Sequence, residues 1–277
     1  MHNKLVEFNV HPLLRKLLAH HEFSQSEETH IALEVLRQRL PQDEFSISQW
    51  AVGLDYYRER IAALNVAPKV CVDYGCGCGN WSIAAARIFD EVIGIDKNVE
   101  RIVIAQEIAQ RLNIHNVTFL HGNSIRMFPQ LEKLSVSCVL AFNVLPFSLE
   151  RLKILDSLCT LLKNNGRMLI SFNEVGVLPY YFLSGLYSLD LNRLKEFALM
   201  IGYNFFHFMV RRTNQCEKTY GWINTNSFMQ ILRERKLIPV WCNWDSDIGE
   251  SYKPLFPLRY LGFPFFQEVL VEKRKSC

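Results

Sequence analysis

The 277-residue sequence has no stretch that approaches the roughly 18 apolar residues of a membrane-spanning helix, and its first residues, MHNKLVEFNV, lack the apolar part of a secretory signal. Glycine and proline are scarce, at 13 and 10 residues, while 49% of the chain is hydrophobic, which excludes collagen-like and disordered proteins. Lys and Arg number 31 and Asp and Glu 28, so the formal net charge is only +3. That balance excludes a chain that coats nucleic acid or an anionic membrane through bulk charge, although a local basic patch stays open. We expect a globular, cytoplasmic protein.

The eight cysteines form no recognisable disulfide or zinc framework. Because nothing at the start of the sequence directs export, reduced thiols are expected. Cys71, Cys76 and Cys78 are close together, but the spacing C-x4-C-x-C is not that of a structural zinc site, and no His or Cys cluster follows to complete four ligands. No metal is predicted, and small side chains in a tight turn explain these residues.

The first 65 residues are predicted to form an N-terminal helical cap. Apolar residues recur at helical spacing between Ile47 and Ile61, and prolines punctuate the segment, which predicts helices over about residues 12–23, 26–40 and 47–64. Two pairs fit a capping box and are expected to mark helix starts: Ser24 with Glu27, and Ser46 with Gln49.

From Lys69 onward, short apolar runs alternate with helical stretches. The strand-like runs are VCVDYG, EVIGIDK, VTFLHG, VSCVLAFNVL and RMLISF. This alternation predicts an α/β fold, in which a parallel sheet carries helices on both faces and binds ligands at the carboxyl ends of its strands. After Phe172 we expect an inserted helical segment rich in aromatic residues, a helix over 224–235, and two final strands, IPVWCNW and FFQEVLVEK.

The segment VCVDYGCGCGNW carries the clearest chemical signal. Asp73 ends a strand, and Gly75, Gly77 and Gly79 alternate through the turn that follows, so the backbone can approach a nucleotide-like ligand without interference from a Cβ atom. The dinucleotide fingerprint G-x-G-x-x-G fails because Asn80 occupies its last position, and the P-loop pattern G-x-x-x-x-G-K-[ST] is absent.

These residues resemble motif I of the class I S-adenosylmethionine-dependent methyltransferases. Asp73, Gly75, Gly77 and Gly79 match its acidic and glycine positions, and Cys76 lies within the same loop. The resemblance implies S-adenosyl-L-methionine as cofactor and a doubly wound, mostly parallel, seven-stranded Rossmann-like sheet. It further implies a cofactor-binding core over residues 66–175, an inserted lid over 176–222, and a completion of the core sheet over 223–277.

The resemblance also assigns cofactor contacts further along the chain. Asp96 matches the carboxylate that receives the two ribose hydroxyls, a task that suits an acceptor-only group. Lys97 matches a position whose aliphatic part lies against the adenine. Where the family often has an acidic residue for the adenine amino group, this chain has Asn123 and Ser124.

The end of the fourth strand should lie beside the transferring methyl group. Asn143 is the expected cofactor contact there, and Phe147 an expected substrate contact. Enzymes of this class that methylate base amino groups carry an Asn or Asp, Pro, Pro, aromatic motif at this point. The stretch NVLPF is one residue too long and has one proline, which counts mildly against a base amino group as acceptor.

The aromatic insertion suggests the class of acceptor. Tyr180 and Tyr181 are expected to contact a small, apolar or aromatic substrate, although ordinary core packing or a homodimer interface would explain the same residues. An acceptor hydroxyl or thiol would need a base to remove its proton. His20, His21 and His207 are weak candidates, and solvated helix residues are the alternative explanation.

Three functions stay open at this stage. The first is a methyltransferase acting on a small molecule. The second is a methyltransferase acting on RNA or protein, with Arg211, Arg212 and the segment RERK as a basic patch but no recognisable nucleic-acid module. The third is a non-catalytic or repurposed protein that binds S-adenosylmethionine. No membrane partner is expected.

Overall fold

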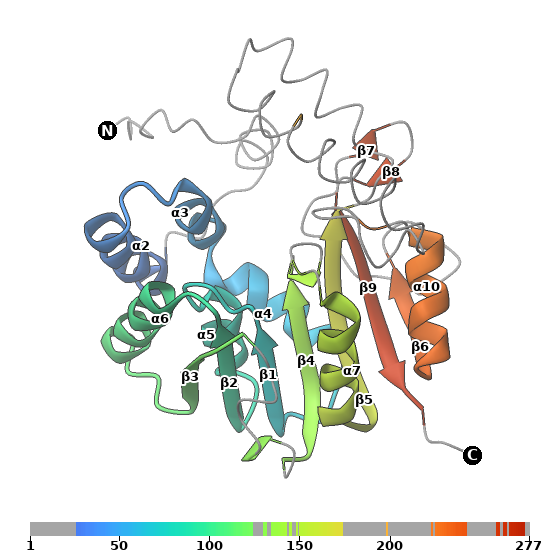
Figure 1. Cartoon of the computed structure of the whole chain (residues 1–277). Helices are drawn as coiled ribbons and strands as arrows, with labels where there is room; N and C mark the ends of the chain where they lie inside the picture. The colour runs from blue at the N-terminus through green and yellow to red at the C-terminus, as the bar shows by residue number, and fades with distance from the viewer. Residues whose placement is uncertain are drawn as a thin grey trace. The chain divides into compact units, whose positions relative to one another are not determined.

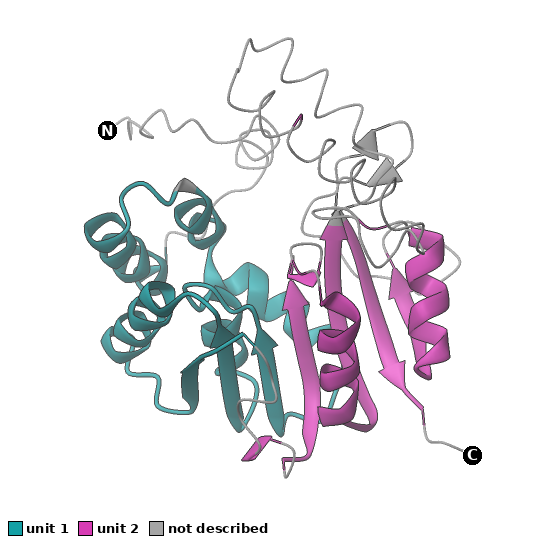
Figure 2. Cartoon of the chain, in the orientation of Figure 1, with its two compact units in different colours: residues 1–123 teal, residues 124–277 magenta. Residues whose placement is uncertain are grey.

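The computed structural model describes residues 26–123, 130–131, 134–142, 144–145, 148, 150–173, 198, 223, 225–242, 259–260, 263–264 and 266–274. The chain divides into two compact units, Met1–Asn123 and Ser124–Cys277 (Figure 2). The four segments expected from the sequence, 1–65, 66–175, 176–222 and 223–277, stay predictions.

Seven strands follow the order β3-β2-β1-β4-β5-β9-β6 (Figure 1). The pairs β1 with β2, β2 with β3, and β4 with β5 are parallel, whereas β9 is antiparallel to both β5 and β6. The expected doubly wound, mostly parallel, seven-stranded sheet is therefore confirmed, and the sheet is mixed rather than strictly parallel.

Unit 1 contains three parallel strands and the helices that follow them. The first two of these strands are largely buried and contain Val and Ile at several positions, whereas the third has one buried residue, Phe119. The Asn98 side chain caps the second of the two following helices by accepting from the backbone N–H groups of Glu100 and Arg101 at 2.9 and 3.1 Å. The elements are β1 (Val70–Tyr74), α5 (Asn80–Ala85), β2 (Glu91–Asp96), α6 (Val99–Arg111) and β3 (Val117–His121).

Three helices at the start of unit 1 correct one of the predictions. They are α2 (Glu27–Arg39), α3 (Glu44–Ala51) and α4 (Leu54–Ala62). The single helix expected over 47–64 is wrong, because Gly53, at φ 93°, separates α3 from α4. The helix expected over 12–23 lies outside the described residues.

The predicted capping boxes are also wrong. The N-cap of α2 is Ser26, whose hydroxyl accepts from the Thr29 N–H, and the N-cap of α3 is Asp43. Ser46 lies inside the first turn of α3 and donates to Asp43. A carboxylate three residues earlier therefore takes the capping role that the pattern assigned to Ser46.

Unit 2 contains the remaining sheet strands. Phe172 of β5 and Phe228 of α10 pack edge to face with ring centroids 4.9 Å apart. This contact packs α10 against the sheet. Lys273 donates to the carbonyl oxygens of Cys159 and Leu162 at 2.5 and 2.6 Å, at the end of the other helix. The elements are β4 (Val136–Phe142), α7 (Arg151–Leu161), β5 (Leu162–Asn173), α10 (Thr225–Glu234), β6 (Leu237–Cys242), the short strands β7 (Arg259–Tyr260) and β8 (Phe263–Pro264), and β9 (Phe266–Lys273).

Among the cysteines in the described part of the chain, none forms a disulfide bond. Within the same residues no group of three His, Cys, Asp or Glu side chains could hold a metal ion. Nor does any described helix combine the length and apolar character needed to cross a membrane.

Substitution of Gly94 should test the packing of unit 1. A Cβ atom on this β2 residue would lie 2.6 Å from Phe119 Cδ1 and 2.8 Å from Ser82 Oγ. We expect Gly94→Ala to lower the free energy of unfolding by about 1–3 kcal/mol through overpacking. The measurement is the urea unfolding midpoint, with Val103→Ala as a surface control, since Val103 is 52% exposed. Equal midpoints for wild type and Gly94→Ala would contradict this packing.

Candidate cofactor site

The glycine loop after β1 is held against the end of β2. The backbone N–H groups of Gly75 and Cys76 both donate to the Ile95 carbonyl oxygen, at 2.7 and 3.0 Å, and Gly79 N–H donates to the Cys76 carbonyl oxygen at 2.9 Å. Gly75, Gly77 and Gly79 have φ values of 80°, 54° and 85°. The turn therefore uses left-handed backbone conformations that glycine adopts without steric cost.

The glycines of this loop have different neighbours. A Cβ atom on Gly79 would lie 2.9 Å from Phe119 Cζ and 3.0 Å from Ala105 Cβ, so Gly79 is needed for packing inside unit 1. A Cβ atom on Gly77 would meet no protein atom within 4 Å. Gly77 therefore borders open space, as expected of backbone that a ligand approaches closely.

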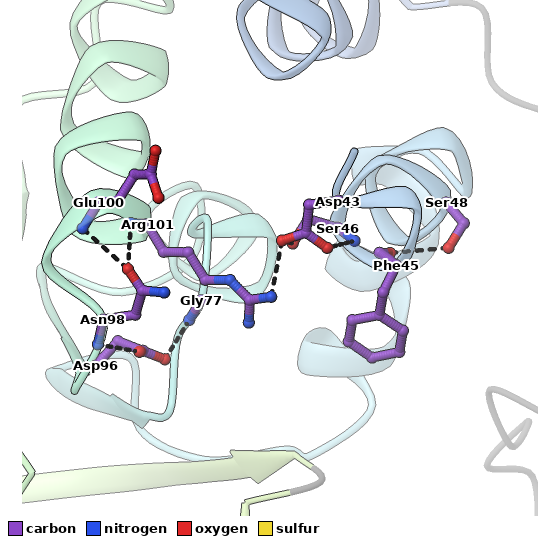
Figure 3. A network of polar contacts seen from close by, with 9 residues as sticks. All are labelled: Asp43, Phe45, Ser46, Ser48, Gly77, Asp96, Asn98, Glu100 and Arg101. Atoms are coloured by element: carbon purple, nitrogen blue, oxygen red, sulfur yellow. Dashed lines mark hydrogen bonds and ion pairs between the residues drawn. The ribbon is translucent and has the colours of Figure 1, made fainter. Parts of the chain in front are cut away.

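Asp96 ends β2 and contacts the loop at Gly77. Its Oδ2 accepts from the Gly77 N–H at 2.9 Å, and its Oδ1 accepts from the Asn98 N–H at 2.8 Å (Figure 3). The side chain is only half-buried. Each carboxylate oxygen can accept a further hydrogen bond, so Asp96 is held in place and keeps acceptor capacity for a pair of hydroxyl groups.

Hydrogen bonds also join β3 to this region. Gly122 N–H donates to the Asp96 carbonyl oxygen at 2.8 Å, and His121 Nε2 lies 3.1 Å from the Lys97 carbonyl oxygen. The Tyr74 hydroxyl donates to the Asn123 carbonyl oxygen at 2.8 Å. These hydrogen bonds connect the ends of β1, β2 and β3. Lys97 and Asn123, which follow β2 and β3, are exposed to solvent.

Asp73 has a different environment from Asp96. It is 1% exposed, and its Oδ2 accepts from the Ser82 hydroxyl at 2.6 Å. Burial, partly offset by the Ser82 hydrogen bond and reinforced by the charge of Asp96, raises the pKa of Asp73 to about 7. Asp73 thus joins the end of β1 to α5 and supports the loop from within the protein.

The structure brings together the sequence-predicted residues Asp73, Gly75, Cys76, Gly77, Gly79, Asp96, Lys97 and Asn123. Cys76 is buried, and that burial raises the pKa of its thiol well above the ordinary value. The other predicted contacts lie outside the described residues and stay predictions: Ser124, Asn143, Phe147, Tyr180, Tyr181, His20, His21 and His207.

Sequence reasoning missed several residues that shape this site. Ser82 holds the Asp73 carboxylate, and Trp50 donates its indole N–H to the Cys78 carbonyl oxygen at 3.3 Å. Asn98, directly before a predicted helix, was recognisable as an N-cap. The contact of Trp50 crosses 28 positions of sequence, and no local pattern indicates it.

Comparison with known proteins gives the family of this site. A family model described as a methyltransferase domain matches residues 67–198. The solved structure of the plantazolicin methyltransferase BamL, in complex with a triazolic desmethylPZN analog and SAH, is similar over 95% of this chain and 94% of its own, with a TM-score of 0.54 and 14% identity. Residues 67–198 therefore form a methyltransferase domain, and the sheet has the fold of the class I S-adenosylmethionine-dependent methyltransferases.

Two further relatives differ in what they cover. An S-adenosylmethionine-dependent methyltransferase from Clostridium acetobutylicum is similar over 87% of this chain and 97% of its own, with a TM-score of 0.52 and 9% identity. A tRNA (uracil(54)-C(5))-methyltransferase of Schizosaccharomyces pombe is 37% identical over 65 residues, which are 24% of this chain and 12% of that enzyme. The expected family and its cofactor, S-adenosyl-L-methionine, are confirmed.

The buried Asp73 should make the stability of this methyltransferase pH-dependent. Its folded-state pKa of about 7 lies above the usual 3.8, so the folded protein binds more protons than the unfolded chain between these values, and this stabilising effect is lost as pH rises toward 7. We expect Asp73→Asn, which keeps an acceptor for Ser82, to remove a slope of up to about 1.4 kcal/mol per pH unit. The measurement is the difference in unfolding free energy between wild type and variant from pH 4.5 to 8. Parallel curves would contradict a buried, protonated Asp73.

Proposed function

We propose that this protein transfers the methyl group of S-adenosylmethionine to a small, apolar or aromatic acceptor. One observation carries the cofactor part of the proposal. Gly77, which has open space at its Cβ position, donates its N–H to the Asp96 carboxylate, which is oriented by two backbone N–H groups and can accept more hydrogen bonds. This combination fits an adenosyl group, whose ribose offers two adjacent hydroxyls as donors.

Each residue of the site has a physical task in this proposal. Asp96 would accept the ribose hydroxyls, while Gly75 and Gly77 would allow the cofactor to approach the backbone. The aliphatic part of the exposed Lys97 and the exposed Asn123 would border the adenine. Asp73 would keep the loop in shape through Ser82 without touching the cofactor.

The cofactor supplies an electrophilic methyl group on its sulfonium, so the protein mainly provides orientation and exclusion of water. Preformed hydrogen bonds between the loop, Asp96 and α6 serve that purpose, since they remove the entropy cost of ordering the loop during binding. A general base is required only for an acceptor that must lose a proton. His20, His21 and His207 stay weak candidates for that task.

The proposed acceptor class rests on composition and on fold. A net charge of +3 provides little bulk attraction for RNA, and Tyr180, Tyr181 and Phe147 would suit an apolar guest. The similarity to BamL, crystallised with a triazolic analog, extends along nearly the whole chain and supports this class at the level of fold. Tyr180 and Tyr181 fall within the inserted segment, which would form the lid of the acceptor site.

RNA is the second candidate acceptor. The 65-residue likeness to the Schizosaccharomyces pombe tRNA methyltransferase favours it, and Arg211, Arg212 and the segment RERK would supply the phosphate contacts. A non-catalytic protein that binds the cofactor for another purpose is the third candidate.

Loss of the Asp96 carboxylate should weaken cofactor binding. We expect Asp96→Ala to raise the dissociation constant of S-adenosylhomocysteine at least about tenfold, because the ribose hydroxyls lose their acceptors. Gly77→Val should prevent binding, because its side chain would fill the open side of the loop. Calorimetric titration is the measurement, and thermal unfolding shows that the variants are folded. Wild-type affinity in both folded variants would refute the site.

A methyl-transfer assay should identify the acceptor class. Purified protein and S-adenosylmethionine with a labelled methyl group are incubated with three fractions of a cell extract: small molecules freed of protein and nucleic acid, RNA, and protein. We expect label in the small-molecule fraction. Label found only in RNA or protein would support the second candidate, and binding of the cofactor without any transfer would support the third.

A further inference from the structure

Helix α3 contacts the glycine loop from outside the region that the methyltransferase domain model matches, residues 67–198. Trp50 is 1% exposed and donates its indole N–H to the Cys78 carbonyl oxygen at 3.3 Å. Burial raises the pKa of the Cys78 thiol to about 11, and the nearby Ser46 side chain, one turn before Trp50, offsets part of that rise. Cys78 lies between Gly77 and Gly79, both of which have left-handed φ values. Helix α3 therefore restrains the backbone at the centre of the glycine loop.

An ion pair joins the beginning of α3 to the first turn of α6. Arg101 Nη2 donates to Asp43 Oδ2 at 2.7 Å, with side-chain exposures of 33% and 15%. The same Asp43 carboxylate accepts from the Ser46 N–H and hydroxyl, at 3.1 and 2.8 Å. Arg101 therefore holds the group that begins α3 and orients Ser46.

These contacts close a ring that includes Gly77. Figure 3 shows the Arg101 guanidinium extending from α6 toward Asp43 on α3, with Gly77 and Asp96 beneath it. From α3 the contacts pass through Cys78 to Gly77, then to Asp96, and then to Asn98. Asn98 Oδ1 accepts from the Arg101 N–H at 3.1 Å. Because Arg101 also binds Asp43 at the start of α3, this hydrogen bond closes the ring.

We propose that Asp43 and Arg101 are positioning residues of the cofactor site, and that α3 is part of that site rather than an appended helix. The inference rests on the proposed function, since it concerns the affinity of the same cofactor. If only the loop conformation that holds Gly77 against Asp96 binds the cofactor, then loosening α3 lowers the fraction of competent protein and raises the apparent dissociation constant by the same factor.

The chain offers a matched control for this ion pair. Arg39 Nε and Glu107 Oε2, 3.0 Å apart, also join an N-terminal helix to α6. That pair connects α2 to a position six residues further along α6, and neither residue takes part in the hydrogen bonds that form the ring. Loss of either pair removes one ion pair between an N-terminal helix and α6, but only the Asp43 pair belongs to the ring.

The test is calorimetric titration of the full-length protein with S-adenosylhomocysteine. We expect Arg101→Gln, and separately Asp43→Asn, to weaken binding about fivefold, the scale of a partly buried ion pair. Asp43→Asn keeps an N-cap acceptor for Ser46. Arg101→Lys should restore most of the affinity, and Arg39→Gln should bind as wild type does. The double variant, Asp43→Asn with Arg101→Gln, should also lose about fivefold, because both changes break one contact.

Thermal unfolding without ligand separates positioning from general stability. Arg101→Gln and Arg39→Gln should lower the melting temperature by similar small amounts, while only Arg101→Gln changes the affinity. Unchanged affinity in Arg101→Gln and Asp43→Asn, equal losses in Arg39→Gln, or no restoration by Arg101→Lys would overturn the inference. A wild-type protein that does not bind S-adenosylhomocysteine would instead refute the proposed function.

Discussion

The hydrogen bond from the Gly77 N–H to the Asp96 carboxylate is the contact on which the site depends. It joins the loop after β1 to the end of β2, so two neighbouring strands present one surface to a ligand. A carboxylate at a strand end has little intrinsic orientation, and the second N–H, from Asn98, removes the remaining freedom. The acceptor for a bound ribose is thereby oriented before the ligand arrives, which reduces the entropy cost of binding.

Glycines in and near the motif meet two different structural requirements, which the sequence alone does not distinguish. Gly79 and Gly94 make room for Phe119, so their small size serves the packing of unit 1. Gly77 has no such neighbour and instead leaves space beside Asp96. A substitution in this region can therefore fail for either of two reasons, and only measurements that separate folding from binding reveal which one applies.

Most of the fold of the described residues could be predicted because its signals are local. Continuous apolar runs such as VCVDYG and EVIGID identified β1 and β2, and the motif with its correctly spaced acid identified Gly77 and Asp96. The helix expected over 47–64 was wrong because apolar spacing continues across Gly53, where the backbone turns at φ 93°. The Asp43–Arg101 pair spans 58 positions, and only tertiary packing brings its members together.

Asp73 illustrates why the acidic position of the motif cannot be interpreted from its residue type alone. Ionisation of a carboxyl group that is 1% exposed carries a desolvation cost, and the charge of Asp96 adds to that cost. Both effects raise the pKa of Asp73 to about 7, so the neutral form of Asp73 is favoured below that pH. The two acids of the motif therefore have opposite environments: one is buried and supports the loop through Ser82, and the other is half-buried with acceptor capacity toward the open side of Gly77. Because a single buried proton reduces the repulsion between them, the fold can keep both carboxyl groups beside one loop while presenting only Asp96 to a ligand.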